Sequence, residues 1–398
     1  MLIHEPGNEV ENMTPATAER ALYSDILNLS VASREYKQFK GILEKFTNAY
    51  EVKDVLASFI ADSQKRELLV DKLTDFIGNP YLSEQLAGFT NEELCNQLIE
   101  GIHFSRLTLT NFLKRERYIV SPLHNFFFSR DAAITIGDTL FTASMAKPVR
   151  EFEALLLNLL FSNSSEFEGN VEAVRDNFPG KGEDIFLEGG DVLVADKDLL
   201  IIGTGSRSSA AGIDALIRKV AARSELKHIL VQELPHEPES FIHLDMVFTL
   251  LSQDECMVFE PLILGDSKYH TVLMTLEGQS IRKIEYVENL IHGLAKTGRE
   301  FKPICCGGNQ AIWQEREQWH SGANFLALDH GKVIGYERNV HTAEELSKNG
   351  YNVVPATELI KNDVSLDSMG KTLITIEGSE LSRGGGGPRC MSMPLVRK

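Results

Sequence analysis

The sequence predicts an α/β fold in which repeated strand–turn–strand–helix units are arranged radially, as in a propeller, with an α-helical subdomain inserted among them. After about residue 120, short apolar or β-branched runs alternate four times with polar turns and helical stretches, a repeat of the size that radial folds use. Between residues 34 and 107 the apolar residues instead recur at helical spacing. The chain has 398 residues, of which 43% are hydrophobic and 24% charged, so it can bury a substantial core and has a globular composition.

The segment 34–107 is expected to contain only helices. The stretches FKGILEKF, VKDVLASFIADSQKRELLVDKL and NEELCNQLIEGI place their apolar residues along helical faces. An Asn-Pro pair at 79–80 is the main helix breaker within the segment. Because no low-complexity linker separates it from the rest of the chain, we predict a helical insertion at 34–107 within an α/β domain formed by residues 1–33 and 108–398.

Four units can be read along the α/β domain, and each has a polar turn between its two strands. They are NFFFSRDAAITIGDTLFTA with a turn at 137–138, IFLEGGDVLVADKDLLIIGTG at 196–198, FIHLDMVFTLLSQDECMVFEP at 254–255 and ANFLALDHGKVIGYERN at 329–331. Helices are expected at PVREFEALLLNLL, from about Ser209, and at TAEELSKNG. The end segments MLIHEP and ITIEGSELSRGGGGPRCMSMPL could supply a fifth unit, which would bring the two termini close together.

Charge and hydropathy exclude several classes of function. The 40 basic and 57 acidic residues give a net charge of −17, which opposes binding to nucleic acid or to an anionic membrane surface. No stretch approaches the ~18 consecutive apolar residues of a membrane span. The first residues, MLIHEPGNEVENM, lack the basic and apolar regions of a secretory signal. We therefore expect a cytoplasmic protein that acts on a small molecule.

Neither a metal nor an organic cofactor is expected. The five cysteines include no CxxC pair and the eleven histidines no HExxH motif, so a thiolate or histidine zinc site is not indicated. The stretch GTGSRS lacks the third glycine of a dinucleotide fingerprint, and the glycines at 384–387 lack the context of a phosphate-binding loop. Four of the cysteines fit core or structural positions in apolar segments: Cys95, Cys256, Cys305 and Cys306.

Four short motifs concentrate polar residues beside predicted strands. They are FSRD at 128–131, LEGGD at 187–191, HLD at 243–245 and GGGGPRC at 384–390. Each alone has a plain structural interpretation as a buried histidine, a turn or a flexible loop. If the strand ends converge, however, one site would contain a thiol, an imidazole and four carboxylates: Cys390, His243, Asp131, Glu188, Asp191 and Asp245.

This combination of groups favours covalent chemistry on a guanidinium substrate. A cysteine and a histidine together indicate attack by a thiolate with proton transfer by the imidazole. A peptide-bond hydrolase needs hydrogen-bond donors for its oxyanion rather than several anions near the nucleophile. A planar guanidinium presents five N–H donors, and paired carboxylates bind it through charge-assisted hydrogen bonds.

At these same residues the sequence resembles the bacterial-type arginine deiminase family, within the guanidino-group modifying (pentein) superfamily. Beside the four motifs, CGGNQAIWQEREQWHSGANFLALDHGKVIGYERN and ELSRGGGGPRCMSMP are similar to extended family signatures. The resemblance implies a five-bladed α/β propeller with an inserted helical bundle. It also implies hydrolysis of L-arginine to L-citrulline and ammonia through a Cys S-alkylthiouronium intermediate, in arginine catabolism, with a homodimer as the family-level expectation.

The resemblance also implies roles for individual residues. Cys390 would be the nucleophile and His243 the general acid and base, while Asp131, Asp245 and Glu188 would bind the guanidinium. The groups expected to bind the rest of the substrate are Asn125, Phe128, Arg150, Arg207 and Asp191. Of these, Asn125, Arg150 and Arg207 would hold the α-carboxylate, and Phe128 would line the pocket.

One departure from the family pattern concerns the loop before the nucleophile. Many deiminases have an arginine five residues before the cysteine, where this chain has Gly385. Loop gating, substrate affinity and the pH profile are therefore open, whereas the reacting groups are all present. Two alternatives also stay open: another guanidine-modifying enzyme of this superfamily, such as a dihydrolase, an amidinotransferase or an agmatine or methylarginine hydrolase, and a non-catalytic binding protein of the same fold.

Overall fold

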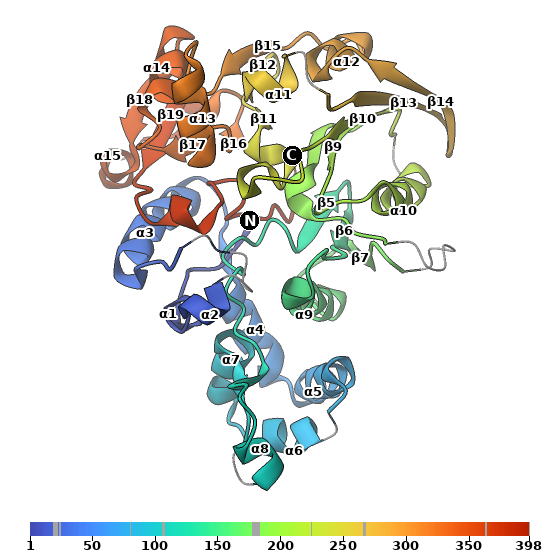
Figure 1. Cartoon of the computed structure of the whole chain (residues 1–398), viewed down its shortest axis with the longest axis vertical. Coiled ribbons are helices and arrows are strands. Elements are labelled where there is room, and N and C mark those ends of the chain that lie inside the picture. The colour runs from blue at the N-terminus through green and yellow to red at the C-terminus, as the bar shows by residue number, and fades with distance from the viewer. Residues whose placement is uncertain are drawn as a thin grey trace.

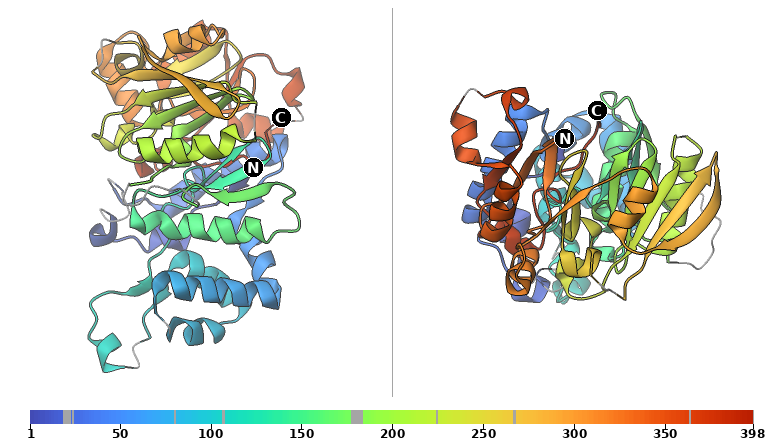
Figure 2. Two further views of the ribbon diagram at one scale, coloured as in Figure 1. Left: turned by 90° about the vertical axis from the view of Figure 1, so that its right-hand side faces the viewer. Right: turned by 90° about the horizontal axis from the view of Figure 1, so that it is seen from above.

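The computed structural model describes residues 1–18, 23, 25–79, 81–105, 108–176, 184–223, 225–265, 268–362 and 364–397. It confirms a mixed α/β fold in which four sheets of three to five strands lie beside one another, with helices on their outer faces (Figures 1 and 2). In the described residues no helix combines the length and the apolar character needed to cross a lipid bilayer.

The four predicted units share one pattern of strand pairing. In each, two antiparallel strands are followed by a crossover that contains a helix and by a strand that pairs in parallel with the second. In the fourth unit this strand is 372–376, and the crossover before it also contains the strand 352–355. A parallel third strand requires such a crossover, and this explains why helices alternate with hairpins in the sequence.

The strands of these sheets have the following bounds. The first sheet contains β5 (Ala133–Ile136), β6 (Thr139–Thr142) and β7 (Asn170–Ala173). The second, in the order β14-β13-β10-β9-β8, contains β8 (Val192–Asp196), β9 (Leu199–Thr204), β10 (His228–Glu233), β13 (Thr271–Glu277) and β14 (Ser280–Val287). The third contains β11 (Phe248–Leu250), β12 (Glu255–Val258) and β15 (Lys302–Cys305). The fourth, β16-β17-β19-β18, contains β16 (Leu326–Asp329), β17 (Lys332–Tyr336), β18 (Asn352–Pro355) and β19 (Thr372–Ile376).

The helices that cover these sheets are α9 (Glu151–Ser162), α10 (Ala210–Ala221), α11 (Glu260–Ile263), α12 (Leu290–Lys296), α13 (Ala311–Trp319), α14 (Val340–Lys348) and α15 (Ala356–Lys361). The sequence predicts α9, α10 and α14, whereas the other helices were not predicted. Helix α10 begins directly after Ser209, whose hydroxyl caps it by accepting from the Gly212 N–H at 3.0 Å. The hairpin β13–β14, between α11 and α12, is an addition that the repeat pattern does not contain.

The chain ends meet, as predicted. Strand β1 (Leu2–Ile3) pairs with β2 (Tyr50–Glu51), and Leu2 also exchanges backbone hydrogen bonds of 2.7 and 2.9 Å with Met393. Figure 1 places both termini near the centre of the molecule. A second small sheet joins β3 (Ile102–His103) to β4 (Tyr118–Val120).

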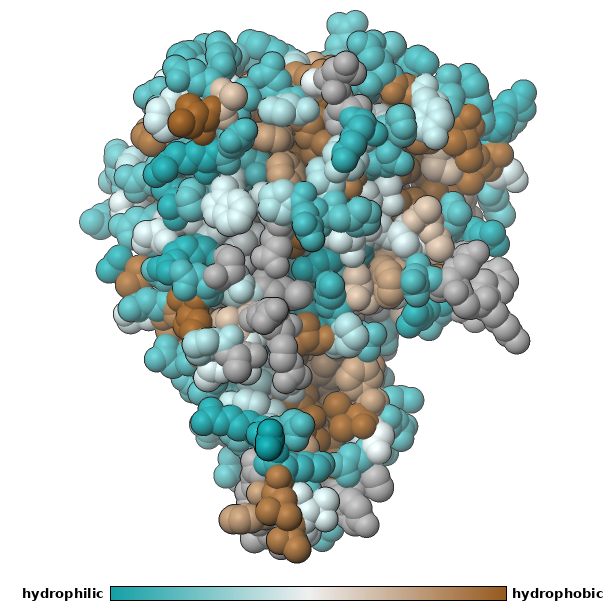
Figure 3. All heavy atoms as spheres, in the orientation of Figure 1, coloured by the Kyte–Doolittle hydropathy of each residue, from teal (hydrophilic) through white to brown (hydrophobic). Residues whose placement is uncertain are grey.

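Residues before 113 are largely helical, but the expectation that 34–107 contains only helices is wrong, because β2 and β3 lie within it and pair with segments outside it. The helices are α1 (Asn8–Glu11), α2 (Pro15–Ala18), α3 (Leu29–Phe46), α4 (Val52–Ala61), α5 (Ser63–Ile77), α6 (Tyr81–Ala87), α7 (Asn91–Glu100) and α8 (Leu109–Phe112). Helix α3 packs against α15 and β19, whereas α4 packs on α5 and α7 and projects with α5–α8 away from the sheets (Figure 1). In Figure 3 the lower tip carries apolar side chains, and Leu109, Phe112 and Leu113 of this region are exposed.

Short 3₁₀ turns sit beside the strands and carry most of the polar motifs. Their bounds are Pro148–Arg150 (η1), Gly189–Asp191 (η2), Glu239–Phe241 (η3), Leu244–Met246 (η4), Leu366–Ser368 (η5) and Leu381–Gly384 (η6). Turns η2 and η4 directly precede the first strands of two neighbouring units. A 3₁₀ turn places successive side chains in fixed directions over a short length of chain, and it is therefore suited to positioning functional groups.

Candidate active site

The four motifs converge, as the sequence predicts. Backbone hydrogen bonds connect them directly: the Gly189 N–H donates to the Asp131 carbonyl at 3.0 Å, and the Arg130 N–H donates to the Cys390 carbonyl at 3.1 Å. The side chain of His243 lies over Gly190, where an added Cβ would come within 2.6 Å of the imidazole. Glycine in the EGGD motif is therefore needed for close approach. All six predicted chemical groups are buried.

His243 lies between two carboxylates. Its Nε2 is 2.9 Å from Glu188 Oε2, and its Nδ1 is 3.6 Å from Asp131 Oδ1. Burial opposes protonation of the imidazole, but the charge of Asp131 and the hydrogen bond to Glu188 outweigh it and raise the pKa of His243 to about 9. Burial likewise opposes ionisation of Glu188, yet Arg207 and His243 lower its pKa to about 2. At neutral pH the pair is an imidazolium and a carboxylate.

The thiol of Cys390 is buried beside Asp245 and Asn324. The Asn324 side-chain amide donates to Sγ at 3.1 Å, and Sγ lies 3.7 and 3.8 Å from the two Asp245 oxygens. Burial, followed by the charges of Asp245 and Asp131, raises the pKa of the Cys390 thiol well above its ordinary value. At neutral pH this group is therefore a thiol, and a nearby positive charge would favour the thiolate.

Each of the three carboxylates expected to bind a guanidinium is already paired with an arginine of the chain. Asp131 accepts from Arg150 at 2.6 Å, Asp245 accepts from Arg389 at 2.5 Å, and Glu188 lies 3.5 Å from Arg207. All of these side chains are buried, and a buried charge without a partner would be costly. An arginine of the chain thus balances the charge of each of these three acids.

Arg150 has hydrogen-bond partners besides Asp131. Its Nε and Nη2 donate to the buried carboxylate of Glu153, with a shortest distance of 2.7 Å, and Nη2 also donates to the carbonyls of Asn125 and Phe128 at 3.3 Å. Sequence reasoning missed Glu153, because a glutamate in the first turn of a helix is ordinarily explained by the helix dipole.

Two of the site carboxylates have oxygens without hydrogen-bond partners among the described residues. They are Asp131 Oδ1 and Asp191 Oδ2, and both are buried. The other oxygen of Asp191 accepts from the Leu244 N–H at 2.9 Å, which ties η2 to η4, and burial raises the pKa of Asp191 to about 7. Buried acceptors are rarely left unsatisfied, so these two oxygens are the natural places for ligand N–H groups or water.

Asn324 is a residue of the site that sequence reasoning missed. Besides donating to Cys390 Sγ, it donates to the Asp245 carbonyl at 3.0 Å, and its Oδ1 accepts from the Arg389 N–H at 3.0 Å. It therefore connects η4 to the nucleophile loop. A neutral amide within an apolar stretch does not by itself indicate a functional residue. The signal that could have found Asn324 is its place in GANF, within the family signature that begins CGGNQ.

The glycine-rich loop before Cys390 is anchored at both ends. Glu35 of α3 is buried and accepts from the N–H groups of Ser379 at 2.8 Å and Leu381 at 2.9 Å, while Tyr336 donates to the Gly386 carbonyl at 3.0 Å. A Cβ on Gly386 would come within 2.4 Å of the Phe128 ring, which lies directly under the loop. Gly385, by contrast, has φ +84° and no atom within 4 Å of an added Cβ, so it faces open space.

One trio of site residues has the arrangement of a metal site. Ligand atoms of Asp131, Glu188 and His243 lie within 4.8 Å of one another. A divalent cation there would have to displace the proton that the raised pKa of His243 retains at neutral pH. The trio is therefore better suited to holding an imidazolium than a metal ion.

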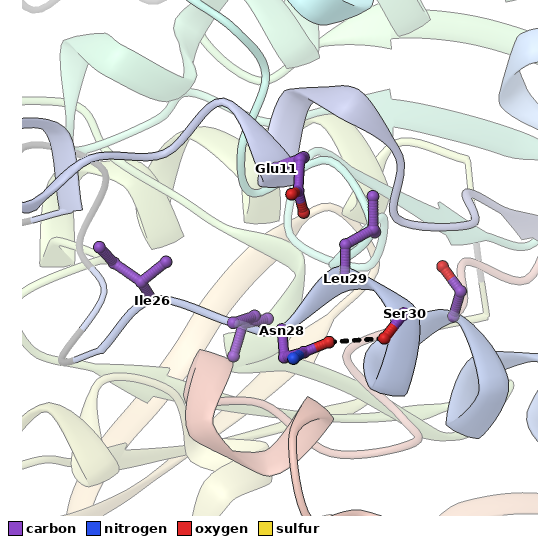
Figure 4. A pocket seen from close by; sticks show the side chains of 7 residues that line it. Glu11, Ile26, Asn28, Leu29 and Ser30 are labelled. Atoms are coloured by element: carbon purple, nitrogen blue, oxygen red, sulfur yellow. Dashed lines mark hydrogen bonds between the residues drawn. The ribbon is translucent and has the colours of Figure 1, made fainter.

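A cavity of about 660 Å³ lies elsewhere, at the start of α3 (Figure 4). Its labelled residues include Asn28, whose Oδ1 accepts from the Ser30 hydroxyl at 2.8 Å. None of the predicted site residues lines it. The Asn28 N–H, at this cavity, donates to Glu380 beside η6 at 2.9 Å.

Comparison with known proteins relates this geometry to one family. The family model described as arginine deiminase matches residues 19–397. The arginine deiminase of Bacillus cereus (strain ATCC 10987 / NRS 248) is 31% identical over 421 residues, covering 100% of this chain and 96% of that protein. The arginine deiminase of Listeria monocytogenes serotype 4b (strain CLIP80459) is 30% identical, covering 100% and 95%.

Solved structures with a similar fold have much lower sequence identity. The N-terminal domain of ArgZ, an arginine dihydrolase from cyanobacteria, has a TM-score of 0.54 at 12% identity and covers 100% of this chain and 98% of that one. A dimethylarginine dimethylaminohydrolase adduct with S-methyl-L-thiocitrulline has a TM-score of 0.53 at 12% identity, covering 98% and 97%. At this identity the likeness extends to the fold alone.

Proposed function

Because this chain belongs to the arginine deiminase family, we propose that it hydrolyses L-arginine to L-citrulline and ammonia with Cys390 as the nucleophile. Membership of this family makes it a hydrolase acting on amidine carbon–nitrogen bonds. The observation that carries the assignment of the site is a buried thiol beside Asp245, together with an imidazolium held between Glu188 and Asp131.

Substrate binding exchanges ion pairs within the site. The guanidinium of the substrate binds Asp131 and Asp245, and Asp131 Oδ1, which is buried without a hydrogen-bond partner among the described residues, accepts one of its N–H groups. Arg150 and Arg389 then need other partners. Arg150 and Arg207, with Asn125, bind the substrate α-carboxylate, which replaces the negative charge that Arg150 loses. Phe128 forms one wall of the pocket under the glycine loop.

The substrate also activates the nucleophile. Its positive charge, between Asp131 and Asp245, cancels the two charges that raise the pKa of Cys390. The thiol then loses its proton to water or to Asp245, which lies 3.7 Å away. The thiolate adds to the central guanidinium carbon, whose C=N π electrons move to nitrogen, and a tetrahedral adduct forms.

His243 supplies and later removes protons. The imidazolium protonates the departing nitrogen, the C–N bond breaks, and ammonia leaves an S-alkylthiouronium on Cys390. The imidazole, now neutral, takes a proton from water as the oxygen adds to the same carbon. Collapse of this adduct breaks the C–S bond, releases citrulline and returns the thiol. Glu188 keeps the imidazole oriented through the 2.9 Å hydrogen bond.

We extend the proposal to architecture and setting. The four sheets, with a fifth unit made by β1 and the C-terminal segment at Met393, support a five-bladed propeller with the helical insertion at 34–107. Packing of α4 with α5 and α7 supports a separate helical part, while α3 packs on the sheet that contains β19. A homodimer, a cytoplasmic location and a role in arginine catabolism complete the proposal.

The test is product formation by purified protein. Equimolar citrulline and ammonia from L-arginine, lost in Cys390→Ala, are expected, and agmatine, methylarginine and citrulline serve as competing substrates. Turnover of one of these in place of arginine would assign another guanidine-modifying activity. No labelling of Cys390 by an electrophilic amidine in folded protein would instead favour the binding-protein alternative.

A further inference from the structure

The mechanism uses Asp131 of the FSRD motif but gives no role to its neighbour Arg130, which is buried. Only 3% of the Arg130 surface is exposed. Arg150, Arg207 and Arg389 are each paired with a carboxylate, whereas Arg130 forms no ion pair with a carboxylate among the described residues. A buried charge without a partner is costly, so this arrangement needs a physical explanation.

The Arg130 guanidinium lies against the chain segment 389–392, which carries the nucleophile. Its Nε donates to the Arg389 carbonyl at 3.1 Å, and its Nη2 donates to the Ser392 hydroxyl at 3.3 Å. The backbone N–H of Arg130 donates to the carbonyl of Cys390 itself at 3.1 Å. One residue therefore forms hydrogen bonds with the nucleophile and with residues on both sides of it.

The backbone of Arg130 also packs closely against the EGGD motif. A Cβ on Gly189 would come within 2.0 Å of the Arg130 carbonyl oxygen. The Gly189 N–H donates to the carbonyl of the next residue, Asp131, at 3.0 Å. Because Arg130 is held between this motif and the nucleophile segment, the position of its guanidinium is fixed relative to the thiol, as positioning of a reactive group requires.

The charge of Arg130 acts on the thiol of Cys390. Burial, followed by the charges of Arg389 and Arg397, lowers the pKa of Arg130, whereas the charges of Asp245 and of an ionised Cys390 raise it. The interaction of two charges is reciprocal, so the Arg130 cation favours the thiolate in turn. An arginine guanidinium stays protonated in proteins. The titratable or charged groups that interact with Cys390 or Arg130 are Asp131, Asp245, Tyr336, Arg389 and Arg397.

The other arginine beside the thiol has an acid partner. The charge of Arg389 also favours the Cys390 thiolate, but the charge of Asp245, which accepts from Arg389 at 2.5 Å, opposes it more strongly. No carboxylate of the described residues is paired with Arg130 in this way. When the substrate guanidinium balances the two aspartates of the site, the positive charge of Arg130 therefore favours ionisation of the nucleophile.

We propose that Arg130 is a positioning residue for the nucleophile, which holds the segment 389–392 and supplies a positive charge that favours the Cys390 thiolate when arginine is bound. This inference rests on the proposed hydrolysis of arginine and deepens it. It also explains why a buried arginine is placed under the nucleophile without a carboxylate of the described residues beside it, since such a carboxylate would cancel the effect.

Alkylation of Cys390 by iodoacetamide, a neutral reagent, tests the charge directly. The rate is measured from neutral to alkaline pH by mass spectrometry of the peptide that contains position 390. In Arg130→Gln the rate at a given pH is expected to fall at least about threefold, because a tenfold loss of thiolate is partly offset by the higher intrinsic reactivity of a more basic sulfur. Arg130→Lys retains the charge and is expected to keep the rate of the unmodified chain.

Turnover gives a second readout. We expect kcat for citrulline formation to fall at least about tenfold in Arg130→Gln, with a smaller change in KM, and to be partly restored in Arg130→Lys, which has the charge without the planar fork of donors. Arg66→Gln is the matched control. Arg66 of α5 also donates to backbone carbonyls, those of Leu86 at 3.2 Å and Phe89 at 2.6 Å, and α5 projects away from the sheets (Figure 1). Its replacement is expected to leave both readouts unchanged.

Two results would overturn the proposal. One is an unchanged alkylation rate in folded Arg130→Gln, and the other is an equal loss in Arg130→Gln and Arg130→Lys, since charge would then not be the cause. If Arg130→Gln does not fold, Ser392→Asp places a carboxylate where Nη2 of Arg130 donates. Slower alkylation than in the uncharged match Ser392→Asn is then expected, and equal rates would overturn the proposal. Alkylation needs no arginine, so absence of citrulline formation by the unmodified chain would refute the proposed function separately.

Discussion

Replacing Glu188 by glutamine tests the electrostatic core of the mechanism. In the folded protein the pKa of His243 is raised from 6.5 to about 9, which favours the imidazolium by roughly 3 kcal/mol at about 1.4 kcal/mol per tenfold change in proton affinity. Glu188 contributes the 2.9 Å hydrogen bond and one of the charges that oppose burial. With Glu188→Gln the charge is lost while burial and Asp131 remain, so the pKa of His243 falls below 9.

The pH dependence of turnover measures this change. Because the imidazolium is the active acid, kcat/KM of the unmodified chain is expected to decline as the pH rises through about 9. In Glu188→Gln the decline begins at a pH lower by at least about one, since a single buried charge-assisted hydrogen bond is worth roughly 1.5–3 kcal/mol. Citrulline formation between pH 6 and 10 gives both profiles, with circular dichroism as the check on folding.

A matched control is available on the surface. Glu288→Gln makes the same chemical change at an exposed glutamate and is expected to leave the profile unchanged. If the alkaline decline stays at the same pH in Glu188→Gln while the protein remains folded, Glu188 does not hold the proton on His243, and the assignment of the acid has to be abandoned.

Three further predictions concern positioning and stability. Asn324→Ala removes the amide that donates to Cys390 Sγ at 3.1 Å, and we expect kcat to fall about tenfold to a hundredfold with a smaller change in KM, measured by citrulline formation; an unchanged kcat would exclude this role. Glu35→Gln leaves the N–H groups at the start of η6 with a neutral acceptor, so KM for arginine should rise and the loop should become more open to proteolysis, whereas an unaltered cleavage pattern would contradict the anchoring role. His4, held by two glutamates, has its pKa raised to about 10 although burial opposes this; its contribution to stability is complete below pH 6.5 and is lost as the pH rises through 10. Thermal unfolding at pH 7 and 10.5 should therefore differ by more in the unmodified chain than in His4→Asn, and equal differences would refute the linkage.

The arginine–carboxylate ion pairs within the site bear on which substrates can bind there. Three carboxylates that would bind a guanidinium are already paired with Arg150, Arg207 and Arg389, so an arginine of the chain balances the charge of each. A zwitterionic substrate matches this arrangement, because it brings a cation for the acids and an anion for the arginines. A substrate without a carboxylate would leave buried arginines unpaired, which is costly.

The sequence by itself determined the repeating units and a largely helical segment, and it predicted the groups that we propose to react. Alternation of short apolar runs with turns identified the hairpins, because side-chain direction in a strand has a period of two. Residue chemistry made Cys390, His243 and the acids candidates, because a thiol and an imidazole beside several carboxylates suit covalent chemistry on a guanidinium. The resemblance to a family then supplied roles for Arg150 and Arg207 that spacing does not reveal.

Only the tertiary structure decided which of these groups touch. The pairing of Asp245 with Arg389, the acceptance of an amide hydrogen from Asn324 by Cys390, and the anchoring of the glycine loop by Glu35 all join segments far apart in the chain. Such contacts depend on how units pack around a shared centre, and no local periodicity encodes them. The pKa values follow the same rule: burial and neighbouring charge set the proton affinity of His243, and both arise only when the units come together.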